Sequence, residues 1–250
     1  MKGLKFRLLS VLMYTSAISM AYGQLEQVKA FYNAIEKQAK KQPVTLQFLE
    51  EDTKLVQDPN RLAQIVLIRH GEPALDKRGW RKRTDAMQYI VDYDSVGVYP
   101  PSFIPLTLSD GEVDVIYTSS INRAVSTAKQ LFHRDELLIP DSLFREFERK
   151  IFSAPNIKLP LWWWTTGSRI FWYMGLNRKG IERKSDAKKR AQEVAAFLEQ
   201  DALNKGKTVL VSHGLLNRYV EKYLKRLGWQ TVYNGGNGYL SQRMLVKYRK

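Results

Sequence analysis

Cysteine is absent from the 250 residues, which excludes disulfides, thiolate zinc sites and cysteine nucleophiles. Histidine is nearly absent: only His70, His133 and His213 occur. Acidic residues are also few, because 25 Asp and Glu stand against 40 Lys and Arg, and the formal net charge is +15. This excess favours acidic partners such as phosphorylated small molecules, nucleic acid or an anionic membrane surface, without choosing among them.

The amino terminus has the pattern of an export signal. Three basic residues stand within the first seven positions, and a mostly apolar run from Leu8 to Met20 follows them. That run is shorter than the roughly 20 apolar residues of a membrane span, and small residues follow it at Ala21 and Gly23. The pattern predicts a cleaved signal peptide over residues 1–23 and a periplasmic or secreted protein. An uncleaved anchor or a buried helix is the alternative.

The remaining chain alternates strand and helix patterns. Short continuous apolar runs predict strands that are buried on both faces, and longer runs with apolar residues one turn apart predict helices. This alternation predicts an α/β fold: a three-layer α/β/α sandwich with a mainly parallel central sheet. The expected strands are 65–68, 115–117, 137–139 and 209–211, with an edge strand within 239–248; the expected helices are 122–132, 186–203 and 215–227.

Two further parts of the chain flank or interrupt this pattern. Residues 24–60 form a leader that begins with a helix over 24–41 and packs on the main domain, 61–250, or links to it. Residues 77–105 and the Trp-rich stretch 159–175 are expected as insertions over the carboxyl ends of the strands. The Trp-rich stretch is interpreted as a satellite core, a substrate lid or a peripheral membrane contact through Trp162, Trp163 and Trp164.

Two of the three histidines, His70 and His213, directly follow predicted strands. His70 comes after the first buried strand, His213 comes after the last one, and a glycine follows each of them. Ligands of an open parallel sheet bind outside the carboxyl ends of the strands. The two histidines are therefore expected to face the same crevice, where each glycine lets backbone come close to a ligand.

Arginines accompany these histidines. Arg69 precedes His70, and Arg123 lies in the first turn of a predicted helix for which Ser120 suits the N-cap. Guanidinium groups match the geometry of phosphate oxygens, so the set predicts an anion pocket rather than a divalent metal site, and no cofactor. A neutral imidazole beside cations is a plausible nucleophile for a phosphoryl group. Glu146, after the short strand, is the candidate acid for the leaving group.

Four motifs in this order resemble the histidine phosphatase superfamily, the phosphoglycerate-mutase-like proteins. They are Val66 to Glu72, Ile116 to Ala128, Phe144 to Glu146, and Val209 to Gly214. The resemblance implies an α/β/α sandwich, a phosphohistidine intermediate and no metal. It implies His70 as the nucleophile, a phosphoryl group bound by Arg69, Arg123 and His213, and Glu146 as the acid of the family's large branch.

The chain departs from the family at two places. Asp76 stands where many members carry an asparagine, and Phe147 to Lys150 replaces a glycine-rich continuation after the acid. Glu148 and Glu72 are therefore kept as alternative acids.

Three functions follow from these motifs. The leading hypothesis is a metal-independent phosphomonoesterase acting on a phosphorylated small molecule. A phosphomutase and a phospholigand-binding protein that has lost turnover are the alternatives. No nucleic-acid partner is expected, because no recognition motif accompanies the positive charge.

Overall fold

The computed structural model describes residues 23–39, 41–49, 61–177 and 179–249, so almost all of the proposed signal peptide lies outside it. A six-stranded sheet in the order β4-β3-β6-β1-β8-β7 forms its centre. The strands β4, β3, β6 and β1 are parallel to one another, and β8 is antiparallel to both β1 and β7. Their bounds are β1 Leu62–Arg69, β3 Ile116–Ser119, β4 Leu138–Asp141, β6 Lys207–Ser212, β7 Gln230–Asn234 and β8 Gln242–Tyr248.

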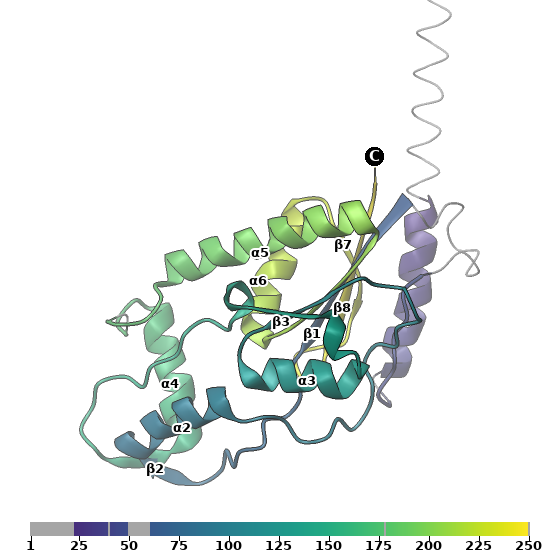
Figure 1. Ribbon diagram of the computed structural model, residues 1–250. Helices are drawn as coiled ribbons and strands as arrows, with labels where there is room; N and C mark the ends of the chain where they lie inside the picture. The colour runs from purple at the N-terminus through teal and green to yellow at the C-terminus, as the bar shows by residue number, and fades with distance from the viewer. Residues whose placement is uncertain (1–22, 40, 50–60, 178, 250) are drawn as a thin grey trace, which may run out of the picture.

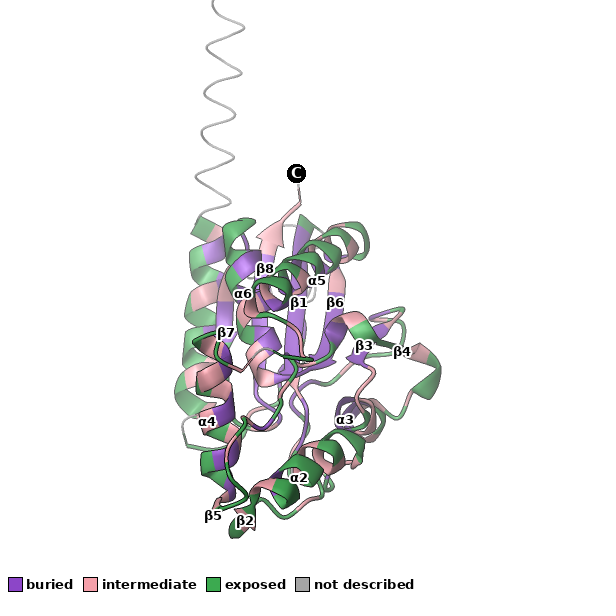
Figure 2. Ribbon diagram, turned by 90° about the vertical axis from the view of Figure 1, so that its left-hand side faces the viewer, coloured by how far each residue is buried: buried purple, intermediate pink, exposed green. Residues whose placement is uncertain are grey.

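Helices cover both faces of this sheet, which confirms the predicted three-layer fold. The helix α5 (Lys184–Lys205) and α6 (Gly214–Arg226) lie on one side, and the helical residues 23–39 lie on the other (Figure 1). The residues of β1 alternate between the two cores: Val66 and Ile68 pack in one, Ile65 and Leu67 in the other. The central strands are accordingly buried along their length (Figure 2).

The carboxyl-terminal part of the sheet differs from the prediction. The stretch predicted as an edge strand contains β8, which lies inside the sheet between β1 and β7. The edge strand is β7, which no apolar run in the sequence predicted. Its five residues pair only with β8 and are buried only at Val232 and Tyr233, so they lack the continuous apolar run of the central strands.

The leader packs on the main domain. Leu25, Val28 and Tyr32 of its helix are buried in the same hydrophobic core as β1. Leu46 is also buried there and forms a parallel bridge with Leu106. The described parts of the leader are thus an integral layer of the sandwich.

The two insertions meet beside the carboxyl ends of the strands. Strand β2 (Trp80–Lys82) pairs with β5 (Lys158–Pro160), and α2 (Arg83–Ser95) contacts α4 (Leu161–Tyr173) (Figure 1). A separate buried cluster of Ala86, Ile151, Leu161 and Trp164 holds them together. This is the satellite core expected for the Trp-rich stretch. Trp164 is fully buried and its indole N–H donates to the carbonyl oxygen of Arg81, so its predicted membrane contact is wrong.

Candidate functional site

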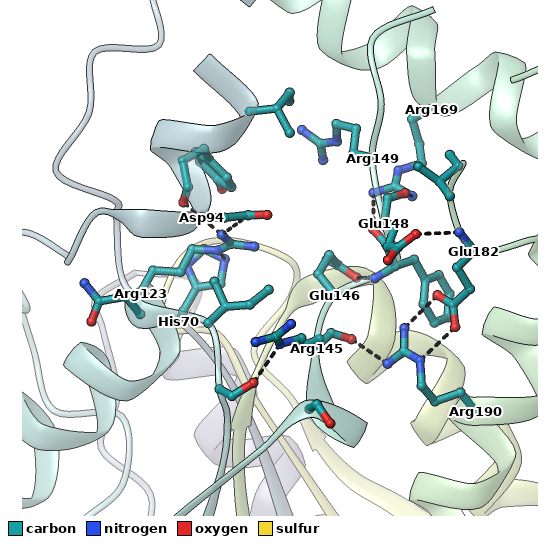
Figure 3. A pocket seen from close by; sticks show the side chains of 18 of the residues that line it. His70, Asp94, Arg123, Arg145, Glu146, Glu148, Arg149, Arg169, Glu182 and Arg190 are labelled. Atoms are coloured by element: carbon teal, nitrogen blue, oxygen red, sulfur yellow. Dashed lines mark hydrogen bonds and ion pairs between the residues drawn. The ribbon is translucent and has the colours of Figure 1, made fainter. Parts of the chain in front are cut away.

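A cavity of about 880 Å³ opens at the carboxyl ends of the parallel strands (Figure 3). Arg69 and His70 enter it from the end of β1, Arg123 from the first turn of α3 (Asn122–Phe132), and Glu146 from the segment after β4. Four of the five residues predicted from the sequence therefore line one cavity. The strand order places β1 beside β6 and β6 beside β3, which brings their ends together.

His70 is buried and held in one orientation. Its Nδ1 lies 2.8 Å from the carbonyl oxygen of Gly71. A carbonyl only accepts hydrogen bonds, so Nδ1 carries the proton and Nε2 keeps its lone pair. The backbone N–H of Gly71 in turn donates to Oγ1 of Thr127, 2.9 Å away. Nε2 is therefore the nitrogen available for attack on a bound group.

Arg123 lies against this nitrogen. Its Nε donates to Nε2 of His70 at 3.3 Å, and its Nη1 donates to the carbonyl oxygen of Tyr93 and to Oδ1 of Asp94, at 2.9 and 2.6 Å. The guanidinium also packs 4.5 Å from the centre of the Tyr93 ring. Within the described residues its Nη2 donates no hydrogen bond, which leaves this arm for an anion beside His70.

Arg69 lies across the start of α6. Its Nη1 donates to the carbonyl oxygen of Asn237, while its buried Nε has no partner in the part of the chain that the structure describes. A Cβ added at Gly214 would lie 3.2 Å from Cδ and Nε of Arg69. The glycine after His213 therefore makes room for this arginine, a role that differs from the close approach of a ligand expected from the sequence.

His213 lies behind His70 and does not line the cavity. Its ring centre is 5.1 Å from that of His70, and its Nε2 lies 2.8 Å from Oγ of Ser119. Its Nδ1 is buried without a hydrogen-bond partner among the described residues. Buried polar atoms are normally paired, so this nitrogen keeps an unused hydrogen-bonding capacity.

Burial and positive charge set the protonation of both histidines. Burial is the main cause that lowers the pKa of His70 well below 6.5, and the charges of Arg123 and Arg69 add to it. The same causes lower the pKa of His213, with burial again first and Arg123 next. Both imidazoles are therefore neutral at neutral pH, the form that a nucleophile requires.

The lowered pKa values predict an acid-sensitive fold. In the unfolded chain these histidines titrate near 6.5, so the unfolded state binds protons first as the pH falls. Their contribution to stability is fully present above 6.5 and is lost as the pH falls toward the lower folded values. The free energy of unfolding then falls by up to about 1.4 kcal/mol per pH unit for each histidine.

Urea unfolding at a series of pH values measures this slope. We expect His70→Asn to make the fall in unfolding free energy below pH 6.5 shallower. His133→Asn, at the exposed residue that caps the end of α3, should leave the slope unchanged. An equal slope in His70→Asn and in the parent would contradict a neutral, buried His70.

The turn after β3 differs from the predicted N-cap. Ile121, not Ser120, is the N-cap residue of α3, and its N–H donates to Oγ of Ser119 at 3.2 Å. Ser120 instead accepts a hydrogen bond from Nε of Arg145 at 2.7 Å and lines the cavity. Ser119 thus stabilises the start of the helix, and Ser120 is part of the cavity wall.

Glu146 lines the cavity with its carboxylate against the amino terminus of α6. Its Oε2 accepts from the N–H of Leu215 at 3.2 Å, and its Oε1 accepts from the N–H groups of Leu216 and Phe147 at 3.1 and 3.0 Å. Donation of a proton to a leaving group would require one oxygen to carry that proton and to turn from the helix to the cavity. The assignment of Glu146 as the acid stays a prediction.

The alternative acids lie differently. Glu148 lines the cavity, and its Oε2 accepts from the N–H of Glu182. Glu72 pairs with Lys77 and does not line the cavity. Asp76, at the family's asparagine position, is exposed and pairs with Arg78. Glu146 and Glu148 are therefore the two predicted acids that lie within reach of a bound ligand.

The cavity contains more charged residues than the motifs indicated. Asp94 of α2 and three arginines, Arg145, Arg149 and Arg169, were not predicted. The interpretation of residues 183–190 as a solvated helix face is wrong for Arg190. This side chain is half-buried, pairs with both carboxylate oxygens of Glu182 at 2.8 Å, and lines the cavity. The many charged residues around Arg190 in the sequence did not indicate that this side chain is partly buried.

Among the described residues no three His, Asp or Glu side chains cluster in a way that would hold a metal ion. None of the described helices combines the length and the apolarity needed to cross a bilayer.

Residues 65–245 match the model of the histidine phosphatase superfamily (branch 1). The chain belongs to this superfamily. The resemblance based on the four sequence motifs is therefore confirmed. The expectation that the protein is a phosphatase is confirmed as well. No curated protein matches the chain.

Three solved structures are similar to this chain at low sequence identity. A mycobacterial glucosyl-3-phosphoglycerate phosphatase is 21% identical, with 74% of this chain and 91% of that chain covered and a TM-score of 0.43. Mycobacterial hydrolase 2 is 20% identical, with 76% and 84% covered and a TM-score of 0.45. A phosphoserine phosphatase mutant from Entamoeba histolytica is 18% identical, with 72% and 89% covered and a TM-score of 0.42.

Proposed function

We propose that this phosphatase hydrolyses phosphate monoesters through a phosphohistidine on His70. The observation that carries the proposal is the state of His70: Nδ1 is fixed by the carbonyl of Gly71, and Nε2 stands beside Arg123 at the cavity. An imidazole held in this tautomer keeps its lone pair on Nε2, and this lone pair can attack phosphorus in line once a bound phosphoryl group takes over the hydrogen bond from Nε of Arg123.

The reaction divides into two transfers. Nε2 of His70 attacks the phosphorus, the ester P–O bond breaks, and the leaving oxygen takes a proton from Glu146. Water then attacks the phosphohistidine, Glu146 regains a proton from that water, and orthophosphate leaves with His70 restored. Arg69 and Arg123 hold the phosphoryl oxygens, and His213 is proposed to contact them through its unpaired Nδ1. Positioning and charge stabilisation then supply most of the rate.

Hydrolysis of an aryl phosphate by residues 24–250 in the presence of a chelator tests this proposal. We expect chelator-resistant release of phosphate. Phosphate binding by folded protein with no turnover at any pH would favour the binding-protein alternative. Transfer of the phosphoryl group to a second acceptor, with little release to water, would favour a phosphomutase.

Replacement of Glu146 by glutamine tests the proposed acid. Aryl phosphates have good leaving groups and need little protonation, so we expect Glu146→Gln to retain most of their hydrolysis. An alkyl phosphate needs the proton, so its kcat/KM should fall by about 10²-fold or more. Glu148→Gln is the matched control on the same cavity wall. A larger loss in Glu148→Gln than in Glu146→Gln would transfer the role to Glu148.

The amino-terminal sequence supports a proposal of export. The basic and apolar residues before Gly23 have the composition of a cleaved signal. We expect the secreted or periplasmic form to begin at Gln24. Amino-terminal sequencing of the protein recovered from outside the cytoplasm measures this, and recovery of an intact amino terminus would contradict it.

We also propose a peripheral membrane contact at the start of α4. Trp162 and Trp163 are 60% and 52% exposed, and Trp80 of the adjoining β2 is 59% exposed. Lys82 and Lys158, which pair across β2 and β5, place positive charge on the same unit. Tryptophan suits the headgroup region of a bilayer, and lysine favours anionic lipids.

Vesicle binding measures this contact. The parent should sediment with vesicles of anionic lipid and much less with neutral ones, and Trp162→Ala with Trp163→Ala should weaken binding by about tenfold or more. Ile139→Ala removes an exposed apolar side chain on β4 and serves as the control. Equal binding by the double variant and the parent would contradict the contact.

A further inference from the structure

Three of the arginines that line the cavity were not among the predicted site residues. Arg145 and Arg149 come from the segment after β4, and Arg169 comes from α4. Figure 3 shows Arg149 and Arg169 beside each other on the far side of the cavity from His70 and Arg123. The cavity of about 880 Å³ is far larger than a phosphoryl group, and it has the size of a pocket for a whole small molecule.

The acidic groups of the cavity are already used by other partners. Asp94 pairs with Arg123, and Glu182 pairs with Arg190. The carboxylates of Glu146 and Glu148 accept hydrogen bonds from backbone N–H groups. Six arginines and four carboxylates line the cavity, so these acids leave part of its positive charge uncompensated.

The hydrogen bonds of the three arginines confirm this. Arg145 donates to the hydroxyl of Ser120, and Arg169 donates only to the carbonyl oxygens of Phe147 and Glu148. Arg149 donates no hydrogen bond to any described residue, and its Nε is buried. In the part of the chain that the structure describes, none of the three pairs with a carboxylate.

The positive charges of Arg149 and Arg169 repel each other. Burial, together with the positive charge of Arg149, lowers the pKa of Arg169 to about 10. Arg169 stays in place because the two carbonyls fix its guanidinium and the ring of Trp172 lies 5.1 Å away. An anion between the two guanidinium groups would remove their repulsion and pair the buried Nε of Arg149.

We propose that Arg149 and Arg169 form a second anion subsite, with Arg145 between it and His70. The substrate is then a phosphate monoester that carries another anionic group, a carboxylate or a second phosphate, on the part that leaves. The inference rests on the proposed function for the phosphoryl end of the cavity. The insertion that contains α4 supplies one of the two arginines, which gives this segment a role in substrate choice.

Binding of alkylphosphonates tests the subsite without any need for turnover. Alkylphosphonates of increasing chain length are compared by calorimetry with the same molecules that carry a terminal carboxylate or a second phosphonate. At the chain length that spans the cavity, we expect the added acid to lower the Kd by about tenfold or more. Whether the carboxylate or the phosphonate gives the larger gain distinguishes the two kinds of second anion.

Two variants decide whether the arginines cause this gain. Arg149→Gln should abolish it, while binding of the simple alkylphosphonate stays within about twofold. Arg226→Gln removes an equal charge from the exposed last turn of α6 and should preserve the gain. Arg149→Lys should restore part of it, which excludes misfolding as the cause of the loss.

The outcomes separate the subsite from the proposed reaction. Equal Kd values with and without the second acid at every chain length, or a gain that persists in Arg149→Gln, would overturn the subsite. A gain that depends on Arg149 in a protein without hydrolysis would support the subsite and count against the proposed reaction alone.

Discussion

Replacement of His70 by alanine is expected to lower kcat for an aryl phosphate by at least about 10⁴-fold, because it removes the proposed nucleophile. A good leaving group does not compensate for this loss, since the P–O bond still needs an attacking atom. The measurement is steady-state release of the aryl alcohol with chelator present. Binding of inorganic phosphate should persist, because Arg69 and Arg123 remain.

The control for this variant is His133→Ala. His133 is exposed and lies at the end of α3, away from the cavity, so its removal should leave kcat unchanged. Thermal unfolding shows whether each variant is folded. Activity in folded His70→Ala within tenfold of the parent would exclude His70 as the nucleophile.

Replacement of Arg123 by glutamine is expected to lower kcat/KM by about 10³-fold. The side chain is 2% exposed and sits between Nε2 of His70 and the carboxylate of Asp94. In the proposed mechanism its Nη2, which donates no hydrogen bond within the described residues, stabilises charge on the phosphoryl oxygens in the transition state. The loss should appear mostly in kcat, because Arg69 still holds the ground state.

Asp94→Asn separates the two contacts of Arg123. It removes the carboxylate partner of Arg123 without touching His70, so we expect less than about a tenfold change in kcat/KM. Arg123→Lys keeps the charge but lacks the planar guanidinium with its paired N–H donors. It should therefore recover only part of the activity that is lost in Arg123→Gln. A change as large in Asp94→Asn as in Arg123→Gln would show that the ion pair, rather than contact with the phosphoryl group, sets the rate.

The central sheet could be predicted because its strands are buried on both faces. The run from Ile65 to Ile68 alternates between two hydrophobic cores, so every position is apolar. The helices α3, α5 and α6 bury residues one turn apart and were predicted within two residues at each end. By contrast, α2 buries only Ala86, and its apolar residues give almost no helical periodicity.

The phosphoryl end of the site could be predicted because each residue sits next to a predicted strand or helix start. Arg69 is the last residue of β1 and His70 follows it, Arg123 lies in the first turn of α3, and His213 follows β6. Their meeting follows from the rule for parallel strand ends. The position of His213 behind His70 was not predicted, because it depends on the depth of each ring below the end of the sheet.

The far wall of the cavity could not be predicted from local pattern. Arg169 reaches it only because β2 pairs with β5 and α4 then packs on α2. Arg190 lies in a charged helical stretch that resembles a solvated face, yet Glu182 and two carbonyl oxygens bind it at the cavity. Such contacts join segments whose relative positions the sequence pattern does not indicate.

Detection of the covalent phosphohistidine is the most direct test of the proposed mechanism. Protein mixed with an aryl phosphate and quenched in alkaline denaturant, which spares phosphohistidine, is digested and analysed by mass spectrometry. We expect one phosphoryl group on the peptide that contains His70, attached through Nε2, and none in His70→Ala. Rapid turnover with no phosphopeptide at any quench time, or a phosphoryl group on another residue, would contradict it.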